Sequence, residues 1–166
     1  MTTLSPSVSD GVAGFRLVRP KVLERIALPG ASTNGALSVM EVVVQPGGLV
    51  APVHTHSRED ETAFVIEGTV GVRLGGEELR VVSGATLFGP RGVPHSFWNA
   101  GKVRARILLV ITPGNLDTYF HEVAGVAGPG PAADTDAIAR HAARFGMAFD
   151  LESTADLAAR HQVSLA

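Results

Sequence analysis

The chain has 166 residues, 45% of them apolar, which is enough for one domain with a sizeable core and too few for two. Its 14 basic and 16 acidic residues give a formal net charge of -2, and this balance gives no electrostatic reason to expect nucleic acid or an anionic membrane as a partner. Cysteine is absent, which excludes disulfides, thiolate metal ligands and cysteine nucleophiles, so a metal ion must be held by His, Asp, Glu or backbone groups.

The N-terminal segment 1–14 is small and polar, and we expect it to form a flexible arm. It lacks the charged region followed by an apolar region that defines a signal peptide. No run in the sequence approaches the roughly 18 apolar residues that span a bilayer. These features predict a cytoplasmic protein without membrane contacts.

Short apolar runs that end at Gly, Pro or Asn fill the following hundred or so residues, a pattern typical of short strands joined by tight turns. One or two strands are expected over 15–28, interrupted at Pro20, and a strong β-branched strand over 36–45. Gly75-Gly76 is a hairpin signal, since glycine accepts the positive φ that such turns need. Further strands are expected in the runs TAFVIEG, TVGVRLGG, EELRVV, ATLFG, HSFWNA and VRARILLVIT. Regular strands at this spacing predict an all-β antiparallel sandwich or barrel.

The character of the sequence changes after Thr112. The segment AGVAGPGPAA predicts a linker, and ADTDAIARHAARFG predicts a helix that Asp134 or Asp136 can cap. A second short helix fits STADLAARHQ, with Ser153 or Thr154 as its cap. We therefore expect a short α-helical tail at the C-terminus.

The resulting domain organisation is a β-domain over 15–120, followed by a linker and helical tail over 121–166. We expect the tail to cover an exposed face of a sheet, the alternatives being a lid and an oligomer contact. Tyr119 and Phe120 precede the linker and are expected to anchor the tail to the β-domain, with capping of its mouth as the alternative.

Two histidine-containing segments carry the candidate chemistry. His54 and His56 are two residues apart, so both imidazoles point to the same face of an extended strand. Glu61 opens the next apolar strand, and a strand–turn–strand path can bring its carboxylate back beside them. His95 follows the turn 90–92 in the second segment. Three neutral imidazoles and one carboxylate are a suitable ligand set for a divalent first-row metal ion with room for water or substrate.

Other residues compete for the same assignment. Glu59 and Asp60 are alternatives to Glu61 as the carboxylate ligand, but they lie in a polar turn where solvated acids are usual, and the spacing to Gly68 favours Glu61. The three remaining histidines fall on or near the expected helices and are interpreted as partly exposed structural residues: His121, His141 and His161.

The motif spacings match those of the cupin superfamily. The first motif reads Gly, five residues, His-x-His, four residues, Glu, six residues, Gly, and the second reads Gly, five residues, Pro-x-Gly, two residues, His, three residues, Asn. All ten specified positions are filled, by Gly48, His54, His56, Glu61, Gly68, Gly84, Pro90, Gly92, His95 and Asn99. One motif pair is present, with only 69–83 between the motifs, so the chain resembles a single-domain cupin.

This resemblance implies an antiparallel jelly-roll barrel over roughly 36–112, with one metal ion inside it. Carried over by position, the metal ligands are His54, His56, Glu61 and His95. The resemblance leaves the identity of the divalent ion open among Fe, Mn, Ni, Co, Cu and Zn. Such cupins are often dimeric through sheet edges, so it also implies a homodimer.

A narrower resemblance concerns the reaction. The run LLVITPGNLDTYFHEVAG and the helical tail resemble quercetin 2,3-dioxygenase-like cupins, which use a metal ion to insert both atoms of O₂ into a flavonol-like ring. This implies a metal-dependent dioxygenase acting on a small hydroxylated molecule, with Glu61 as the group that takes the substrate proton. Two alternatives stay open: a metal-dependent isomerase, decarboxylase or cyclase, and a non-catalytic small-molecule-binding cupin.

The facing of several strand residues follows from alternation. Phe97 shares a face with His95, where it either lines a pocket or fills the core, and Trp98 is expected to point the other way, toward an outer face or a subunit contact. Met40 and Arg106 are candidates for the inner face, although their facing depends on strand register.

Overall fold

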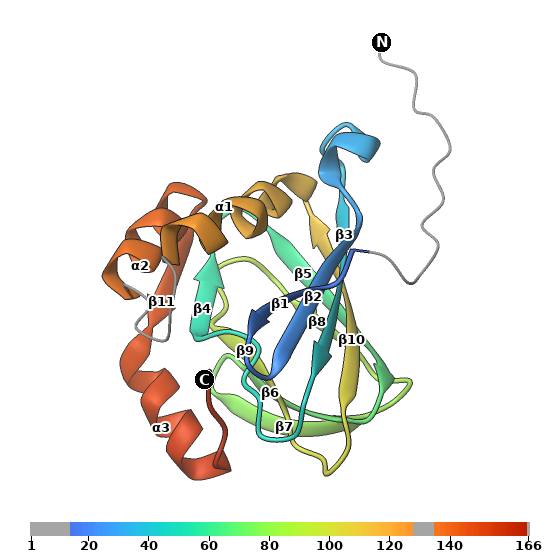
Figure 1. Cartoon of the computed structure of the whole chain (residues 1–166), viewed down its shortest axis with the longest axis vertical. Coiled ribbons are helices and arrows are strands. Elements are labelled where there is room, and N and C mark those ends of the chain that lie inside the picture. The colour runs from blue at the N-terminus through green and yellow to red at the C-terminus, as the bar shows by residue number, and fades with distance from the viewer. Residues whose placement is uncertain (1–13, 128–134, 166) are drawn as a thin grey trace.

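The computed structural model describes residues 14–127 and 135–165 of the chain (Figure 1). The expected N-terminal arm, apart from Gly14, and most of the expected linker lie outside these residues. In the described part of the chain, no helix has both the length and the apolar character that crossing a membrane requires.

Two antiparallel sheets form the β-domain (Figure 1). The first contains, in spatial order, β1 (Arg16–Arg19), β2 (Val22–Leu28), β3 (Ser38–Val44), β10 (Ala105–Thr112), β5 (Asp60–Glu67) and β8 (Thr86–Gly89). The second contains β11 (Met147–Asp150), β4 (Val53–His56), β9 (His95–Asn99), β6 (Thr69–Leu74) and β7 (Glu77–Val82). The expected antiparallel jelly-roll class is confirmed. The two sheets do not join into one closed ladder among the described strands, so the arrangement is an open two-sheet jelly roll rather than a closed barrel.

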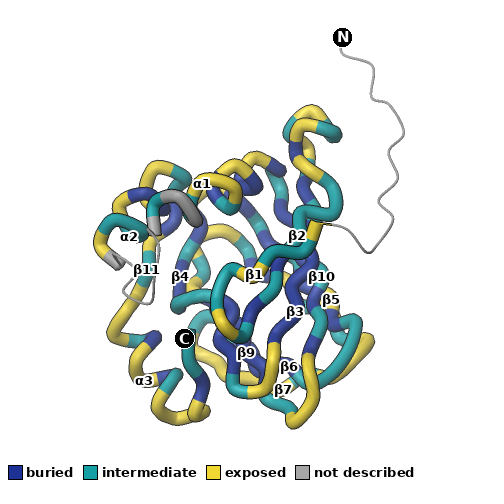
Figure 2. The backbone as a smooth tube through the Cα atoms, viewed as in Figure 1, coloured by how far each residue is buried: buried dark blue, intermediate teal, exposed yellow. Residues whose placement is uncertain are grey.

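The core lies between the two sheets, as the dark blue facing strands in Figure 2 show. It draws on Val42 and Ile107 from the first sheet and on Val70 and Phe97 from the second. Strand β10 alternates strictly between buried and partly buried residues, the pattern expected of a strand with one face on a core.

Register decides two of the uncertain facings. Met40 is opposite Leu109, and both are buried in the core, so Met40 faces inward. Arg106 is opposite Val43 and lies on the outer face, where its Nε donates to Glu41 Oε1 at 3.0 Å. The inward facing considered for Arg106 is therefore wrong, because a shift of one residue in register exchanges the faces of a strand.

Three helices follow β10 along the chain: α1 crosses one end of the molecule, at the top of Figure 1, and α2 and α3 lie on the side where β11 runs. They are α1 (Asp117–Ala127), α2 (Thr135–Arg144) and α3 (Leu151–His161), and two short 3-10 helices span Gly30–Thr33 and Gly114–Leu116. The helix α1 runs to Ala127, so the first four residues of the linker expected over 124–133 are helical.

The N-cap of α3 differs from the expected residues. Asp150 is the cap, and its carboxylate accepts a hydrogen bond from the Ser153 backbone N–H at 2.9 Å. Thr154 is buried one turn further on, and its hydroxyl accepts the backbone N–H of Val53 at 2.9 Å. This second contact ties α3 to the strand β4.

The helix α3 covers the outer face of the second sheet, as expected for the tail. Trp98 points outward from β9 but is only 2% exposed, because it packs in a cluster with Leu49, Val53, Leu157 and Val163. The strand β11 was not expected from the sequence. It lies between α2 and α3 and adds an edge strand to the second sheet.

Gly71 provides a test of this packing. A Cβ atom at position 71 would lie 1.9 Å from Cε2 of Trp98, so the indole ring occupies the space that any side chain would need. The substitution Gly71→Ala should lower the free energy of unfolding by about 1–3 kcal/mol, the usual cost of overpacking. Chemical denaturation measures this change.

Gly76 is the matched control, since a Cβ atom there would meet no atom within 4 Å. The substitution Gly76→Ala should change stability by less than about 0.5 kcal/mol. Equal effects of the two substitutions would show that Trp98 is not seated against β6.

Candidate metal centre

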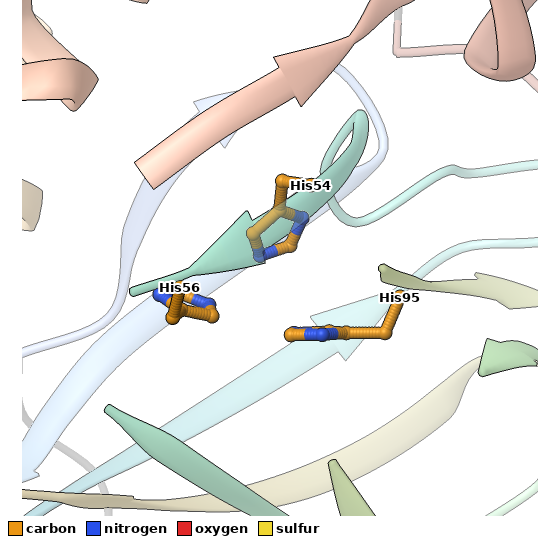
Figure 3. A group of neighbouring side chains, drawn as sticks. All are labelled: His54, His56 and His95. Atoms are coloured by element: carbon orange, nitrogen blue, oxygen red, sulfur yellow. The ribbon is translucent and has the colours of Figure 1, made fainter. Parts of the chain in front are cut away.

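Three histidines meet at one end of the second sheet. His54 and His56 come from β4, and His95 is the first residue of β9, where it pairs with His54 in the register of the two strands. Their ligand atoms lie within 4.8 Å of one another, and Figure 3 shows the three imidazoles gathered in the same space. The alternation of β4 explains this arrangement, because Val53 packs outward against the Trp98 cluster while the histidines point inward.

Glu61 reaches the same place from the opposite sheet. Its Oε2 atom lies 3.8 Å from Nε2 of His56, and its Oε1 atom lies 3.8 Å from Nε2 of His95. The side chains of Glu61, His56 and His95 are each at most 6% exposed, so bulk water does not separate them. The structure thus brings together all four residues that the sequence nominated.

Hydrogen bonds orient two of the rings. Nδ1 of His54 lies 2.7 Å from the Pro52 carbonyl, and Nδ1 of His95 lies 3.0 Å from the Val93 carbonyl. A carbonyl only accepts, so in both rings the proton resides on Nδ1 and the lone pair on Nε2. Nε2 of His95 is buried without a hydrogen-bond partner, as are both ring nitrogens of His56. Buried lone pairs without partners fit a metal ion, because such groups otherwise carry a desolvation cost.

Burial sets the protonation of the site. Desolvation, with the neighbouring imidazoles, lowers the pKa of His54 well below its usual value and that of His56 to about 3. Burial raises the pKa of the Glu61 carboxyl, an effect that the nearby His95 opposes. At neutral pH His54 and His56 are therefore neutral, as an imidazole ligand of a metal ion must be.

The neighbouring acids differ from each other. Asp60 turns outward, and Nη2 of Arg91 lies 2.8 Å from its Oδ2 atom, an interaction that lowers the pKa of Asp60 to about 2. Glu59 is only 4% exposed, so the expectation of a solvated acid is wrong for this residue. Its Oε2 atom lies 3.8 Å from Nδ1 of His56 and has no hydrogen-bond partner. The polar composition of the turn 57–60 does not indicate that Glu59 is buried, because this burial depends on the path of the chain from the turn into β5.

None of the other histidines joins this group among the described residues. His121 is exposed, and His161 lies 2.7 Å from Glu78 on the outside of the second sheet. His141 is buried, contrary to the expected partial exposure, because it stacks on Tyr119 with ring centroids 5.7 Å apart. This contact joins α2 to α1, and Tyr119 also packs in one cluster with Ile111 of β10, so it anchors the tail to the β-domain as expected.

Two aromatic rings border the histidines. The Phe97 ring centroid lies 6.0 Å from that of His95, and the residue is part of the core between the sheets. The Phe149 ring, on β11, lies 6.2 Å from His54 at 89°. Phe149 was not predicted as a neighbour of the site, because the four-residue strand that carries it is too short to recognise from its pattern.

Comparison with known proteins agrees with this fold and site. A model of the cupin domain matches residues 40–111. The tetracenomycin polyketide synthase protein TcmJ of Streptomyces glaucescens is 32% identical over 125 residues, which cover 71% of this chain and 77% of that protein. The chain belongs to the cupin family.

Two further similarities differ in the share of the related protein that they cover. Germin-like protein subfamily T member 2 of Arabidopsis thaliana is 39% identical over 110 residues, which cover 63% of this chain but only 46% of that protein. The chain thus spans about half the length of this relative. The solved structure of the polyketide cyclase RemF from Streptomyces resistomycificus superposes with a TM-score of 0.56 over 65% of this chain and 79% of that one. At 24% identity this likeness supports the fold alone.

Proposed function

We propose that the chain is a metal-dependent cupin enzyme whose ion is held by His54, His56, His95 and Glu61. The observation that carries this proposal is the cluster of three buried imidazoles within 4.8 Å of one another, next to a buried carboxylate. A divalent ion bound there would supply Lewis acidity toward a carbonyl, enol or phenol oxygen. The donor set of nitrogen and oxygen atoms suits Fe, Mn, Ni, Co, Cu or Zn.

We infer that the substrate is a small enolisable molecule of the polyketide type, with several carbonyl or phenol groups. The similarity to a polyketide synthase protein supports this class, since it extends over 71% of the chain. The absence of a basic block and the net charge of -2 do not favour a highly anionic or polymeric substrate.

Glu61 is the proposed proton acceptor. Its carboxylate lies 3.8 Å from Nε2 of both His56 and His95, and burial raises the pKa of this carboxyl. Its role is to take a proton from an acidic C–H between two carbonyls, or from a phenol, and to return it to the product. The low exposure of the site keeps bulk water away from the reacting atoms.

The reaction type divides into two candidates. Cyclisation or isomerisation of a polycarbonyl needs only Lewis acidity and the Glu61 base, and the similarity to the polyketide synthase protein favours it. A quercetin 2,3-dioxygenase-like reaction would use the same residues and consume O₂. This dioxygenase reaction is supported only by the resemblance of the run LLVITPGNLDTYFHEVAG and the helical tail to quercetin 2,3-dioxygenase-like cupins.

The deciding experiment incubates the metal-loaded protein with short polyketide thioesters and with hydroxylated flavones, in air and under nitrogen. We expect a product of unchanged mass, or one that has lost water, to form equally under both gases. Incorporation of ¹⁸O₂ into the product would establish the dioxygenase candidate instead. Turnover that survives metal removal by a chelator would contradict the proposed function.

A further inference from the structure

The three histidines are anchored in two different ways. His54 and His95 each direct Nδ1 to a backbone carbonyl, at 2.7 Å and 3.0 Å. His56 has no such carbonyl partner, and both of its ring nitrogens are buried without a hydrogen bond. The nearest acid to its Nδ1 atom is the carboxylate of Glu59, at 3.8 Å.

Glu59 is itself an unusual residue. Its side chain is 5% exposed, although it lies in the polar turn between β4 and β5. Its Oε2 atom has no hydrogen-bond partner among the described residues. The adjacent acid, Asp60, has an arginine partner and faces outward, so the two neighbouring carboxylates lie in different surroundings. Oε2 of Glu59 and Nδ1 of His56 are thus two buried atoms, 3.8 Å apart, and neither has a hydrogen-bond partner in the described part of the chain.

We propose that Glu59 is a positioning residue that accepts the Nδ1–H of His56 and thereby directs Nε2 of this ring toward the metal ion. This inference rests on the proposed metal site and adds a residue to it. A carboxylate that accepts from a metal-bound imidazole fixes the tautomer and increases the basicity of the ligand. His56 is then the strongest imidazole donor of the three, because only it has an anionic anchor.

The change Glu59→Gln removes the charge but keeps the size and an acceptor oxygen. It should weaken Zn²⁺ and Co²⁺ binding by about 10-fold, and Glu59→Ala by about 100-fold, the range found for partners of metal-bound histidines. Competition with a chromophoric chelator measures these affinities. Glu67→Gln is the control, since Glu67 ends the strand β5 that follows Glu59, has a side chain that is 41% exposed and is paired with Arg104, and it should leave the affinity unchanged.

A second measurement distinguishes positioning from a general structural effect. In the Zn²⁺-loaded protein, ¹⁵N-resolved NMR follows the Nδ1–H proton of each liganding histidine. Glu59→Gln should move the signal of His56 upfield and leave those of His54 and His95 in place. A merely structural role in the turn would move all three signals or none.

The outcomes separate this inference from the proposed function. Weaker metal binding with a selective shift of the His56 signal supports the role of Glu59. Unchanged affinity, or signals that move together, overturns that role while the metal site stands. A wild-type protein that binds neither ion would overturn the proposed function and this inference with it.

Discussion

Replacing His95 with alanine is expected to abolish stable metal binding. The change leaves two imidazoles and a carboxylate, and it removes the ligand that β9 contributes opposite His54. Loss of a direct ligand should weaken binding by more than the roughly 100-fold upper range seen when a hydrogen-bonded partner of a ligand is lost. His56→Ala should have the same effect. Elemental analysis of protein equilibrated with one equivalent of Zn²⁺ or Co²⁺ measures the bound ion per chain.

His141→Ala is the control for this prediction. His141 is as buried as the candidate ligands, at 6% exposed, but it stacks on Tyr119 between the helices. Its removal should leave the metal content unchanged. Full occupancy in the His95 variant, or a large loss in the His141 variant, would show that the ion binds elsewhere.

A large loss of stability is expected when the contact between the helix α3 and the second sheet is truncated. Leu157 of α3 is fully buried and packs with Trp98 and Val53 over the outer face of the second sheet. Leu157→Ala should therefore lower the free energy of unfolding by about 2–5 kcal/mol, as for other core truncations that leave a cavity. Urea denaturation monitored by the fluorescence of Trp98, the single tryptophan, reports on the same cluster.

Leu151→Ala in the same helix provides the comparison. Leu151 is 48% exposed, so its truncation should change stability by less than about 0.5 kcal/mol. If both leucine variants were equally stable, α3 would be a loosely attached lid. A selective loss in the Leu157 variant shows instead that the tail is part of the folded β-domain.

The approach of the four candidate ligands to one another could be predicted in part from local geometry. On one short strand, two histidines separated by a single residue must share a face, and this is how His54 and His56 lie. Glu61 and His95 follow turns at fixed spacing, and motif positions specified their place. The strands themselves were recognisable because each ends at a turn-forming residue, such as Gly75, which has φ +61°.

Non-local features escaped prediction. The strand β11 has only four residues, and its pairing with β4 joins segments about ninety residues apart, which no local pattern encodes. The facing of the Arg106 side chain depends on the register between β10 and β3, which only the folded sheet defines. The burial of Glu59 arises from the path of the turn, whereas its composition predicted a solvated segment. For β11 and Arg106 the deciding interaction is between distant parts of the chain.

X-ray absorption at the metal edge of the loaded wild-type protein tests the central claim most directly, since it reports the ligands of the bound ion. The spectrum should show the multiple scattering of three imidazoles and the contribution of at least one oxygen atom, at one ion per chain. Glu61→Ala should retain the imidazole signal. A spectrum with one imidazole or none would contradict the assignment of His54, His56 and His95 as the metal centre.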